Sequence, residues 1–389
     1  MMARMLPIPL SLEAMEAAPV RELPVGPSWQ YEPKWDGFRC LAFRDRGSVH
    51  LQSKSGQSLD RYFPEVLAAL GALPLTRFVM DGELVIPVSG GLSFSQLQMR
   101  LHPAASRVLR LSRETPARYM VFDWLAEGGR TLLTTPLGER RTRLEAVAAS
   151  AFPGSTGSVV LSPMSLERSV AQGWVDGGVA GLDGAIAKHR DAAYQAGVRD
   201  PSVMVKVKRI RTADCVVGGF RYGTGSTQVG SLLLGLYDAA GLLHHVGFTA
   251  SIAHADRPAL TKRLDRLRGP SRFTGRAPGA PSRWSTERSS AWEPVAPSLV
   301  VEVAFDHVTD ERFRHGTKLL RFRTDKKPVR CTIDQIAPLA LPAKPGQGVT
   351  ALRASKTLKK RTAVATVRSS RAPPATRPQA HRNAMRRRS

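Results

Sequence analysis

The sequence predicts an α+β protein in three parts: a mixed body over residues 1–208, a small β-barrel over 209–342 and a disordered basic tail over 343–389. Short apolar strands alternate with helical segments up to Lys208, and a stretch of strands with glycine turns follows. From Lys344 to Ser389 the chain has thirteen Lys and Arg, no Asp or Glu, and few large apolar residues. That composition is typical of disorder. A length of 389 residues also suits two domains and a tail.

The elements of the first body follow from apolar periodicity and from turn residues. In chain order we expect a hairpin region over 29–52, a helix at 64–70 opened by Pro64, a strand, an Asp81-Gly82 turn and a second strand over 77–88, a short helix at 93–101, a buried strand at 118–125, helices at 138–150 and 165–175, and strands at 184–187 and 203–207.

The second part has a different pattern. Its expected elements are strands at 216–220, 232–237, 242–248 and 299–305 and a helix at 254–268. A set of about five short strands with one helix favours a barrel of the oligonucleotide-binding type, the OB-fold. An SH3-like barrel would give a similar pattern, so both barrels stay open at this point.

The charge indicates the kind of partner. The formal net charge is +25 and the pI is about 11.0. Without the thirteen cations of the tail, +12 remains on the rest of the chain. A basic body with a basic tail predicts a polyanionic partner, most simply a nucleic acid.

The remaining composition indicates where the protein works. Three distant cysteines, Cys40, Cys215 and Cys331, form neither a disulfide framework nor a zinc pattern, and we expect idle thiols. The N-terminus lacks a signal-peptide pattern, and no apolar run approaches the ~20 residues of a membrane span. We therefore expect a soluble protein in a reducing, cytosolic compartment.

One lysine is the candidate nucleophile. Lys34 lies in Glu32-Pro33-Lys34-Trp35-Asp36-Gly37-Phe38-Arg39, at a strand end beside an Asp-Gly turn. The first 261 residues contain only five lysines, whereas arginine supplies nearly all other positive charge there. An amine can lose its proton and attack, which a guanidinium cannot. The alternative is an ordinary solvated surface charge.

Three further clusters supply what such a nucleophile needs. They are Asp81-Gly82-Glu83, the segment from Asp183 to Lys188, and Val205-Lys206-Val207-Lys208, where alternation places both ammonium groups on one face of a strand. Two separated carboxylates suit Mg²⁺, which binds a few oxygens together with phosphate. A lysine, a metal and phosphate-neutralising cations are the parts of a nucleotidyl-transfer site.

These stretches together resemble the covalent nucleotidyltransferases. Glu32–Arg39 matches the E-x-K-x-D-G-x-R pattern of their motif I. The other matching segments are 53–56 with 62–65 (motif Ia and the following Tyr-Phe-Pro-Glu), 78–85 (motif III), 121–125 (motif IIIa), 181–188 (motif IV), 203–208 (motif V) and 321–328 (motif VI). The order, the Tyr62–Glu65 segment and the compact length resemble the bacterial ATP-dependent DNA ligases of the ligase C and ligase D class. The resemblance implies an N-terminal nucleotidyltransferase (adenylation) domain followed by an OB-fold.

The resemblance also implies roles for individual residues. Lys34 attacks the α-phosphate of ATP. The ATP-binding residues would be Glu32 and Phe122 at the adenine, Arg39 and Glu83 at the ribose, Lys54, Lys206 and Lys208 at phosphates, and Arg323 and Lys326 at the leaving pyrophosphate, oriented together with Asp325. Glu83 and Asp183 would be the carboxylates of an Mg²⁺ site, with Mn²⁺ as an alternative metal.

Three positions depart from the family pattern: Asp183 stands for Glu, Lys54 for Arg, and Met204 for a frequent Trp. Two rival functions stay open. An RNA ligase or capping enzyme shares the Lys-x-Asp-Gly core, and a basic DNA-binding protein would keep the fold without catalysis. The preferred hypothesis is a monomeric ligase that seals nicked or broken duplex DNA in repair, recombination or end joining, with a Ku-like protein as a further expected partner.

Overall fold

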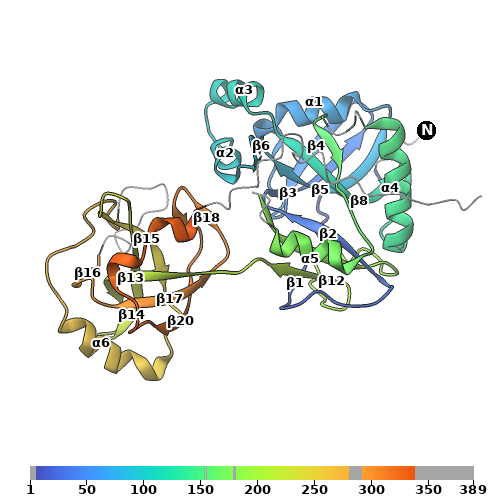
Figure 1. Cartoon of the computed structure of the whole chain (residues 1–389). Coiled ribbons are helices and arrows are strands. Elements are labelled where there is room, and N and C mark those ends of the chain that lie inside the picture. The colour runs from blue at the N-terminus through green and yellow to red at the C-terminus, as the bar shows by residue number, and fades with distance from the viewer. Residues whose placement is uncertain (1–5, 153, 155, 178–180, 280–290, 338–389) are drawn as a thin grey trace, which may run out of the picture. The chain divides into compact units, whose positions relative to one another are not determined.

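The computed structural model describes residues 6–337 apart from residues 153, 155, 178–180 and 280–290 (Figure 1). The chain is a mixed α+β protein in which sheet predominates. The described part contains no helix long and apolar enough to cross a membrane. The expected tail over 343–389 lies outside the described residues.

Two sheets form the N-terminal body, and their strands supply most of the site described below. The first sheet contains, in order, β1 (Ala18–Pro19), β12 (Met204–Lys208), β11 (Leu182–His189) and β2 (Trp29–Trp35). The second contains β10 (Val159–Leu161), β8 (Arg118–Glu127), β5 (Arg77–Val85), β3 (Phe38–Asp45) and β4 (Ser48–Ser53), with β9 (Arg130–Thr131) on β8. A small hairpin of β6 (Pro87–Val88) and β7 (Gly91–Leu92) stands apart from both sheets.

The turn at Asp36-Gly37 takes the chain from the first sheet to the second. It separates β2, which ends at Trp35, from β3, which begins at Phe38. A Cβ at Gly37 would lie 2.1 Å from the carbonyl oxygen of Leu84, so only glycine allows this close approach. Lys34 is thereby held near the end of β2, as the sequence predicted.

The expected turn at Asp81-Gly82 is wrong. Residues Arg77–Val85 form one continuous strand, β5, which pairs with β3 on one side and β8 on the other. Gly82 is required by packing rather than by a turn, because a Cβ there would lie 2.5 Å from the ring of Tyr119.

Helices α1 (Pro64–Ala72), α4 (Leu137–Ala151) and α5 (Arg168–Asp176) pack on the sheets of the N-terminal body. Two further helices, α2 (Phe94–Met99) and α3 (Ala105–Glu114), accompany them, with the 3₁₀ turn η1 (Asp60–Tyr62) before α1. Pro64 opens α1, and the Ser93 side chain caps α2 by accepting from the backbone N–H of Gln96. Helix α3 and strand β10 were not expected from the sequence.

The chain then forms a third sheet, in the order β15-β14-β13-β17-β20. Its strands are β13 (Arg211–Tyr222), β14 (Val229–Tyr237), β15 (Leu243–Thr249), β17 (Val300–Phe305) and β20 (Lys318–Phe322), with β16 (Glu293–Pro294) on β13. A parallel bridge from Thr249 to Thr317 links the end of β15 to the segment before β20. The two ends of the strand order therefore approach each other.

Shorter elements complete this part. They are helix α6 (Arg257–Asp265), the hairpin of β18 (Val308–Thr309) and β19 (Arg312–Phe313), and the 3₁₀ turns η2 (His254–Asp256), η3 (Pro328–Arg330) and η4 (Ile333–Ile336).

The hydrophobic cores divide between residues 207 and 213. Three buried clusters draw their members from residues 8–207, and a fourth draws its members from residues 213–336. All three cysteines are buried free thiols, as expected.

Candidate functional site

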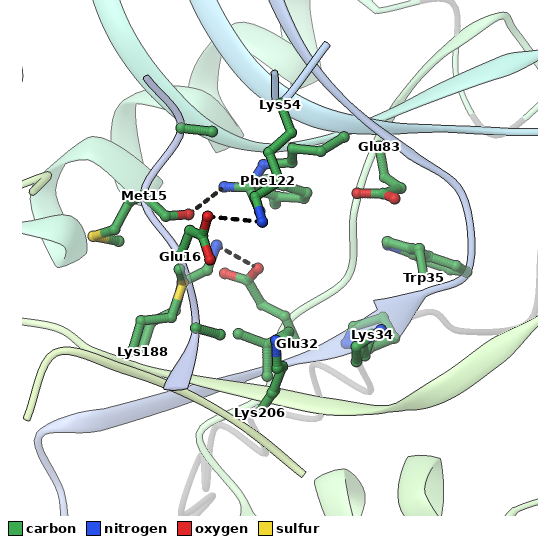
Figure 2. Close-up of a pocket in the computed structure, with 16 residues that line it drawn as sticks. Met15, Glu16, Glu32, Lys34, Trp35, Lys54, Glu83, Phe122, Lys188 and Lys206 are labelled. Carbon is green, nitrogen blue, oxygen red and sulfur yellow. Dashed lines mark hydrogen bonds and ion pairs between the residues drawn. The ribbon is translucent and has the colours of Figure 1, made fainter. Parts of the chain in front are cut away.

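A cavity of about 210 Å³ lies where the two N-terminal sheets meet. Both sheets and the segment before β1 contribute side chains to it, and Figure 2 shows these side chains directed toward a common space. Its charged and aromatic lining consists of Glu16, Glu32, Lys34, Trp35, Arg39, Lys54, Glu83, Phe122, Lys188 and Lys206. Seven residues that the sequence assigned to the site are therefore brought together here.

Lys34 faces a β-bulge in the neighbouring strand. Between the pairs Leu182–Trp35 and Ala185–Pro33, β11 contains one more residue than β2. The extra residue allows Asp183 to reach Lys34, whose ammonium donates to Oδ2 of that carboxylate. Burial alone would raise the pKa of Asp183, but its contacts with His307 and Lys34 outweigh this and lower the pKa.

Glu32 is paired deep in the cavity wall. Its carboxylate lies 2.7 Å from the ammonium of Lys188 and accepts a hydrogen bond of 2.9 Å from the Gln30 amide. The Lys188 ammonium also lies 4.2 Å from the centroid of the Phe122 ring. The sequence identified Lys188 as a rare lysine but assigned it no role. Its pairing could not be foreseen, because Glu32 and Lys188 come from different strands.

Arg39 reaches Phe122 from another direction. Its guanidinium carbon lies 4.6 Å from the ring centroid, and Nε and Nη2 each donate to the buried Asp81 at 2.6 Å. The Tyr194 hydroxyl donates to the same carboxylate at 2.7 Å. The Asp81 carboxylate therefore holds Arg39 against Phe122, a function that sequence reasoning missed when it placed Asp81 in a turn.

Glu83 is the least compensated carboxylate of the cavity. Within the described chain no hydrogen bond or ion pair to it is found. Burial raises its pKa to about 7, and the charges of Arg39 and Lys34 oppose that rise only in part. The described residues contain no group of three or more His, Cys, Asp or Glu side chains that could hold a metal by themselves.

Lys54 and Lys206 supply positive charge at the other end of the cavity. Lys54 lies 2.7 Å from Glu16, a residue that the sequence did not identify. Lys206 lines the cavity without an ion-pair partner in the described residues. Burial and the nearby charges of Lys34 and Arg199 lower its pKa.

Three predicted residues do not line the cavity. Lys208 lies 2.7 Å from Asp306. Arg323 and Lys326 both pair with Asp214, at 2.9 and 2.7 Å. Alternation did place Lys206 and Lys208 on one face of β12, but only Lys206 reaches the cavity.

Two residues from the loops after β17 contact the same site. Nε2 of His307 lies 2.7 Å from Oδ1 of Asp183, without the alignment of a hydrogen bond. Arg314 donates to both oxygens of Asp36, at 2.8 and 3.0 Å. No sequence signal marked His307 or Arg314, because each acts on a carboxylate more than 100 residues away in the chain.

Comparison with known families gives two matches. Residues 15–208 match the ATP dependent DNA ligase domain, and residues 225–326 match the ATP dependent DNA ligase C terminal region. The chain belongs to the ATP-dependent DNA ligase family. Like other ligases of this family, it is an enzyme that uses ATP to seal DNA through an adenylated intermediate.

Individual relatives agree with this assignment. DNA ligase C2 of Mycolicibacterium smegmatis is 42% identical over 350 residues, which span 85% of this chain and 96% of that protein. DNA ligase C of Mycobacterium tuberculosis is 38% identical over 347 residues, 85% of this chain and 95% of that protein. The multifunctional non-homologous end joining protein LigD of Mycobacterium bovis is 34% identical over 304 residues, 77% of this chain and 37% of that protein.

Proposed function

We propose that Lys34 is the residue that carries AMP in this ligase. Its deprotonated amine attacks the α-phosphate of ATP, forming a phosphoramide bond to AMP and releasing pyrophosphate. AMP then passes to the 5′-phosphate at a nick, and the 3′-hydroxyl displaces it as the strand is joined. The observation that supports this role is the place of Lys34 in the cavity, beside Asp183 and within a set of cations.

The base and sugar of ATP have suitable neighbours in the cavity. Phe122 would stack on the adenine, and Glu32 would accept from it while keeping its pair with Lys188. Arg39 and Glu83 would contact the ribose. The support is that all five residues border or contact one cavity.

The phosphate contacts divide into two groups. Lys54 and Lys206 lie in the cavity already and would bind phosphate oxygens there. Lys208, Arg323 and Lys326 are paired with Asp306 or Asp214 in this structure. We propose that these three residues exchange those carboxylates for phosphates of ATP when the C-terminal part closes on the nucleotide. Asp325, which accepts from Arg323 at 2.8 Å, would help to orient that arginine.

The residues present fit a magnesium ion bound together with ATP. Glu83 has no partner in the described chain, and Glu83 and Asp183 would supply the hard oxygen ligands that Mg²⁺ or Mn²⁺ takes alongside phosphate. Bound there, the metal would neutralise charge on the phosphates of ATP.

We propose a division into an adenylation domain at 1–208, an OB-fold at 209–342 and a basic tail at 343–389. The separation of the hydrophobic cores between residues 207 and 213 supports the first boundary. The five-stranded sheet, the parallel bridge between its ends and helix α6 between β15 and β17 support an OB-fold rather than an SH3-like barrel.

The substrate would be nicked or broken duplex DNA, bound by a monomer. The similarity to an end-joining LigD protein supports a role in end joining, with a Ku-like protein as a partner. Because ATP and chromosomal DNA meet in the bacterial cytoplasm, we place the enzyme there, at the nucleoid.

Labelling with α-³²P-ATP tests the role of Lys34. The wild type should form a labelled protein with ATP and Mg²⁺, peptide mapping should locate the label on Lys34, and nicked DNA should remove it. Lys34→Arg keeps the positive charge but should lose at least a thousandfold in labelling rate, because guanidinium stays protonated.

GTP and nicked RNA serve as the comparison substrates. Label from GTP, or sealing of RNA but not of nicked duplex DNA, would contradict the proposed choice of substrates. Absence of label with either nucleotide, under Mg²⁺ and Mn²⁺, would contradict the role proposed for Lys34.

A further inference from the structure

The carboxylate of Glu16, which lines the cavity, pairs with two cations: Lys54, which also lines the cavity, and Arg199. Oε1 of Glu16 lies 2.7 Å from the Lys54 ammonium. Oε2 accepts from Nε of Arg199 at 3.1 Å and also from Nη2 of that arginine. The side chains of Lys54 and Arg199 are 55% and 53% exposed, so solvent and solutes reach both cations.

The backbone around Glu16 is held from both sides. The Glu16 N–H donates to the Val198 carbonyl at 3.0 Å, and the Met15 N–H donates to the Tyr194 hydroxyl at 3.0 Å. Arg39 donates to the Met15 carbonyl at 3.4 Å. The Glu16 side chain can therefore leave its partners while the backbone of the segment stays in place. This side chain is 24% exposed.

The charges around Glu16 favour a second anion. Lys206 lines the same cavity, and no ion-pair partner for it is found in the described residues. Burial lowers the pKa of Lys206, and the nearby positive charges of Lys34, Arg199, Lys208 and Lys54 lower it further. A terminal phosphate, such as the γ-phosphate of ATP or the 5′-phosphate at a nick, brings nearly two negative charges and three acceptor oxygens, more than one carboxylate at the same place.

We propose that Glu16 takes the place of a substrate phosphate on Lys54 and Arg199 in the ligand-free enzyme and competes with that phosphate for them. The inference rests on the proposed function, in which ATP and the DNA strand both bring phosphates to this cavity. The incoming phosphate binds the two cations and Lys206, and the Glu16 side chain turns toward solvent. Binding must therefore break two ion pairs, so Glu16 lowers the affinity of the site for anions. The decrease matters most for anions that make no other contact with the enzyme.

Glu16→Gln tests the competition, because it keeps the length of the side chain and removes its charge. The two readouts are the KM for ATP in the self-labelling reaction and the Kd for nicked duplex, measured on protein freed of AMP with pyrophosphate. We expect one of them to fall by about two- to tenfold, as for the loss of two partly exposed ion pairs. A fall in the KM for ATP would assign the phosphate to ATP, and a fall in the Kd would assign it to DNA.

Glu114→Gln is the matched control. It makes the same change of charge in an exposed pair, Arg110–Glu114 on α3, away from the cavity lining. Glu16→Gln combined with Arg199→Gln should lose the tighter binding expected of Glu16→Gln alone, because the cation that Glu16→Gln releases is then absent. The melting temperature of each variant shows whether it is folded.

The proposal on Glu16 is overturned if Glu16→Gln matches Glu114→Gln in both readouts, or if it weakens the binding of both ligands. This result is distinct from failure of the proposed function. A wild type that takes no label from ATP would contradict the role of Lys34, whereas a labelled wild type with an unresponsive Glu16 variant would contradict only the competition.

Discussion

At the scale of single residues, the cavity depends on how each charge is paired. Glu32 pairs with Lys188, and Asp81 pairs with Arg39, and three of these four side chains are almost fully buried. Removing one partner of such a pair leaves an uncompensated buried charge, which is more costly than losing the pair as a whole. Glu83 is different, because the described residues give it no partner.

The burial of Glu83 without a partner in the described residues leads to a prediction about pH and stability. Burial raises its pKa from an ordinary 4.5 to about 7, so between these values the folded protein holds a proton that the unfolded chain has lost. Stability then falls as the pH rises through this window. Glu83→Gln should remove this loss of stability. Relative to the wild type, the variant should be more stable by on the order of 2–3 kcal/mol above pH 7 and by little below pH 4.5.

The measurement is the melting temperature of the metal-free and nucleotide-free protein against pH. The difference between Glu83→Gln and the wild type should grow as the pH rises and level off above pH 7. Glu114→Gln, at an exposed pair, should show no such growth. A difference that does not vary with pH would mean that burial does not raise the pKa of Glu83.

Residue types, spacing and the family resemblance predicted many of the residues that line the cavity. Lys34, Glu32, Arg39, Lys54, Glu83, Phe122 and Lys206 were all named from sequence and resemblance, and all line it. Glu16, Lys188 and Tyr194 were not assigned to it. Their importance comes from partners on other strands, and sequence spacing does not reveal such pairs.

At the scale of elements, the bulge in β11 is the feature that completes the site. Gly184 has a φ of +130°, and a Cβ there would lie 2.0 Å from the carbonyl oxygen of Val207. Only glycine fits this backbone, and the bulge it forms aims Asp183 at Lys34. The sequence marked Asp183-Gly184 as a pair but gave no reason for the glycine.

Gly184→Ala should therefore damage both stability and labelling. The strained φ and the clash should cost about 1–3 kcal/mol of unfolding free energy. Displacement of Asp183 should lower the rate of Lys34 labelling by at least tenfold. Chemical denaturation and α-³²P-ATP labelling measure the two effects.

Gly129→Ala provides the comparison for Gly184→Ala, because a Cβ at Gly129 meets nothing within 4 Å. It should change stability by less than about 0.5 kcal/mol and leave labelling unchanged. If Gly184→Ala behaved in the same way, the bulge would have no part in orienting Asp183.

The wrong turn at Asp81-Gly82 has a physical cause at this scale. Asp-Gly pairs occur in turns because glycine accepts positive φ. Glycine also occurs where another side chain approaches the backbone, and here the Tyr119 ring takes that space. The two reasons give the same dipeptide, so the sequence alone did not separate them.

At the scale of the whole molecule, positive charge is spread over the body and concentrated in the last residues. Thirteen of the 57 Lys and Arg lie between Lys344 and Ser389, without a single Asp or Glu. Cations that bind DNA phosphates release counterions, so affinity falls as salt rises, and the slope is steeper when more phosphates are neutralised.

Deletion of residues 343–389 should weaken the binding of nicked duplex and reduce the slope of log affinity against log salt concentration. The slope should become shallower by about 0.9 for each DNA phosphate that the tail no longer neutralises. A full-length chain with the thirteen tail cations replaced by Gln should match the deletion, which separates charge from length. An unchanged affinity and slope would mean that the tail does not bind DNA.

The sequence by itself pointed to the family of this protein, to Lys34 as the proposed nucleophile, and to the cations and carboxylates proposed around it. These depend on residue types and local spacing, which a linear chain displays. Only the tertiary structure decided which charges pair across strands, that Asp81-Gly82 lies inside a strand, and that Glu16 meets Lys54 and Arg199. Those pairs join residues far apart in the chain, and they form only when packing brings the strands together.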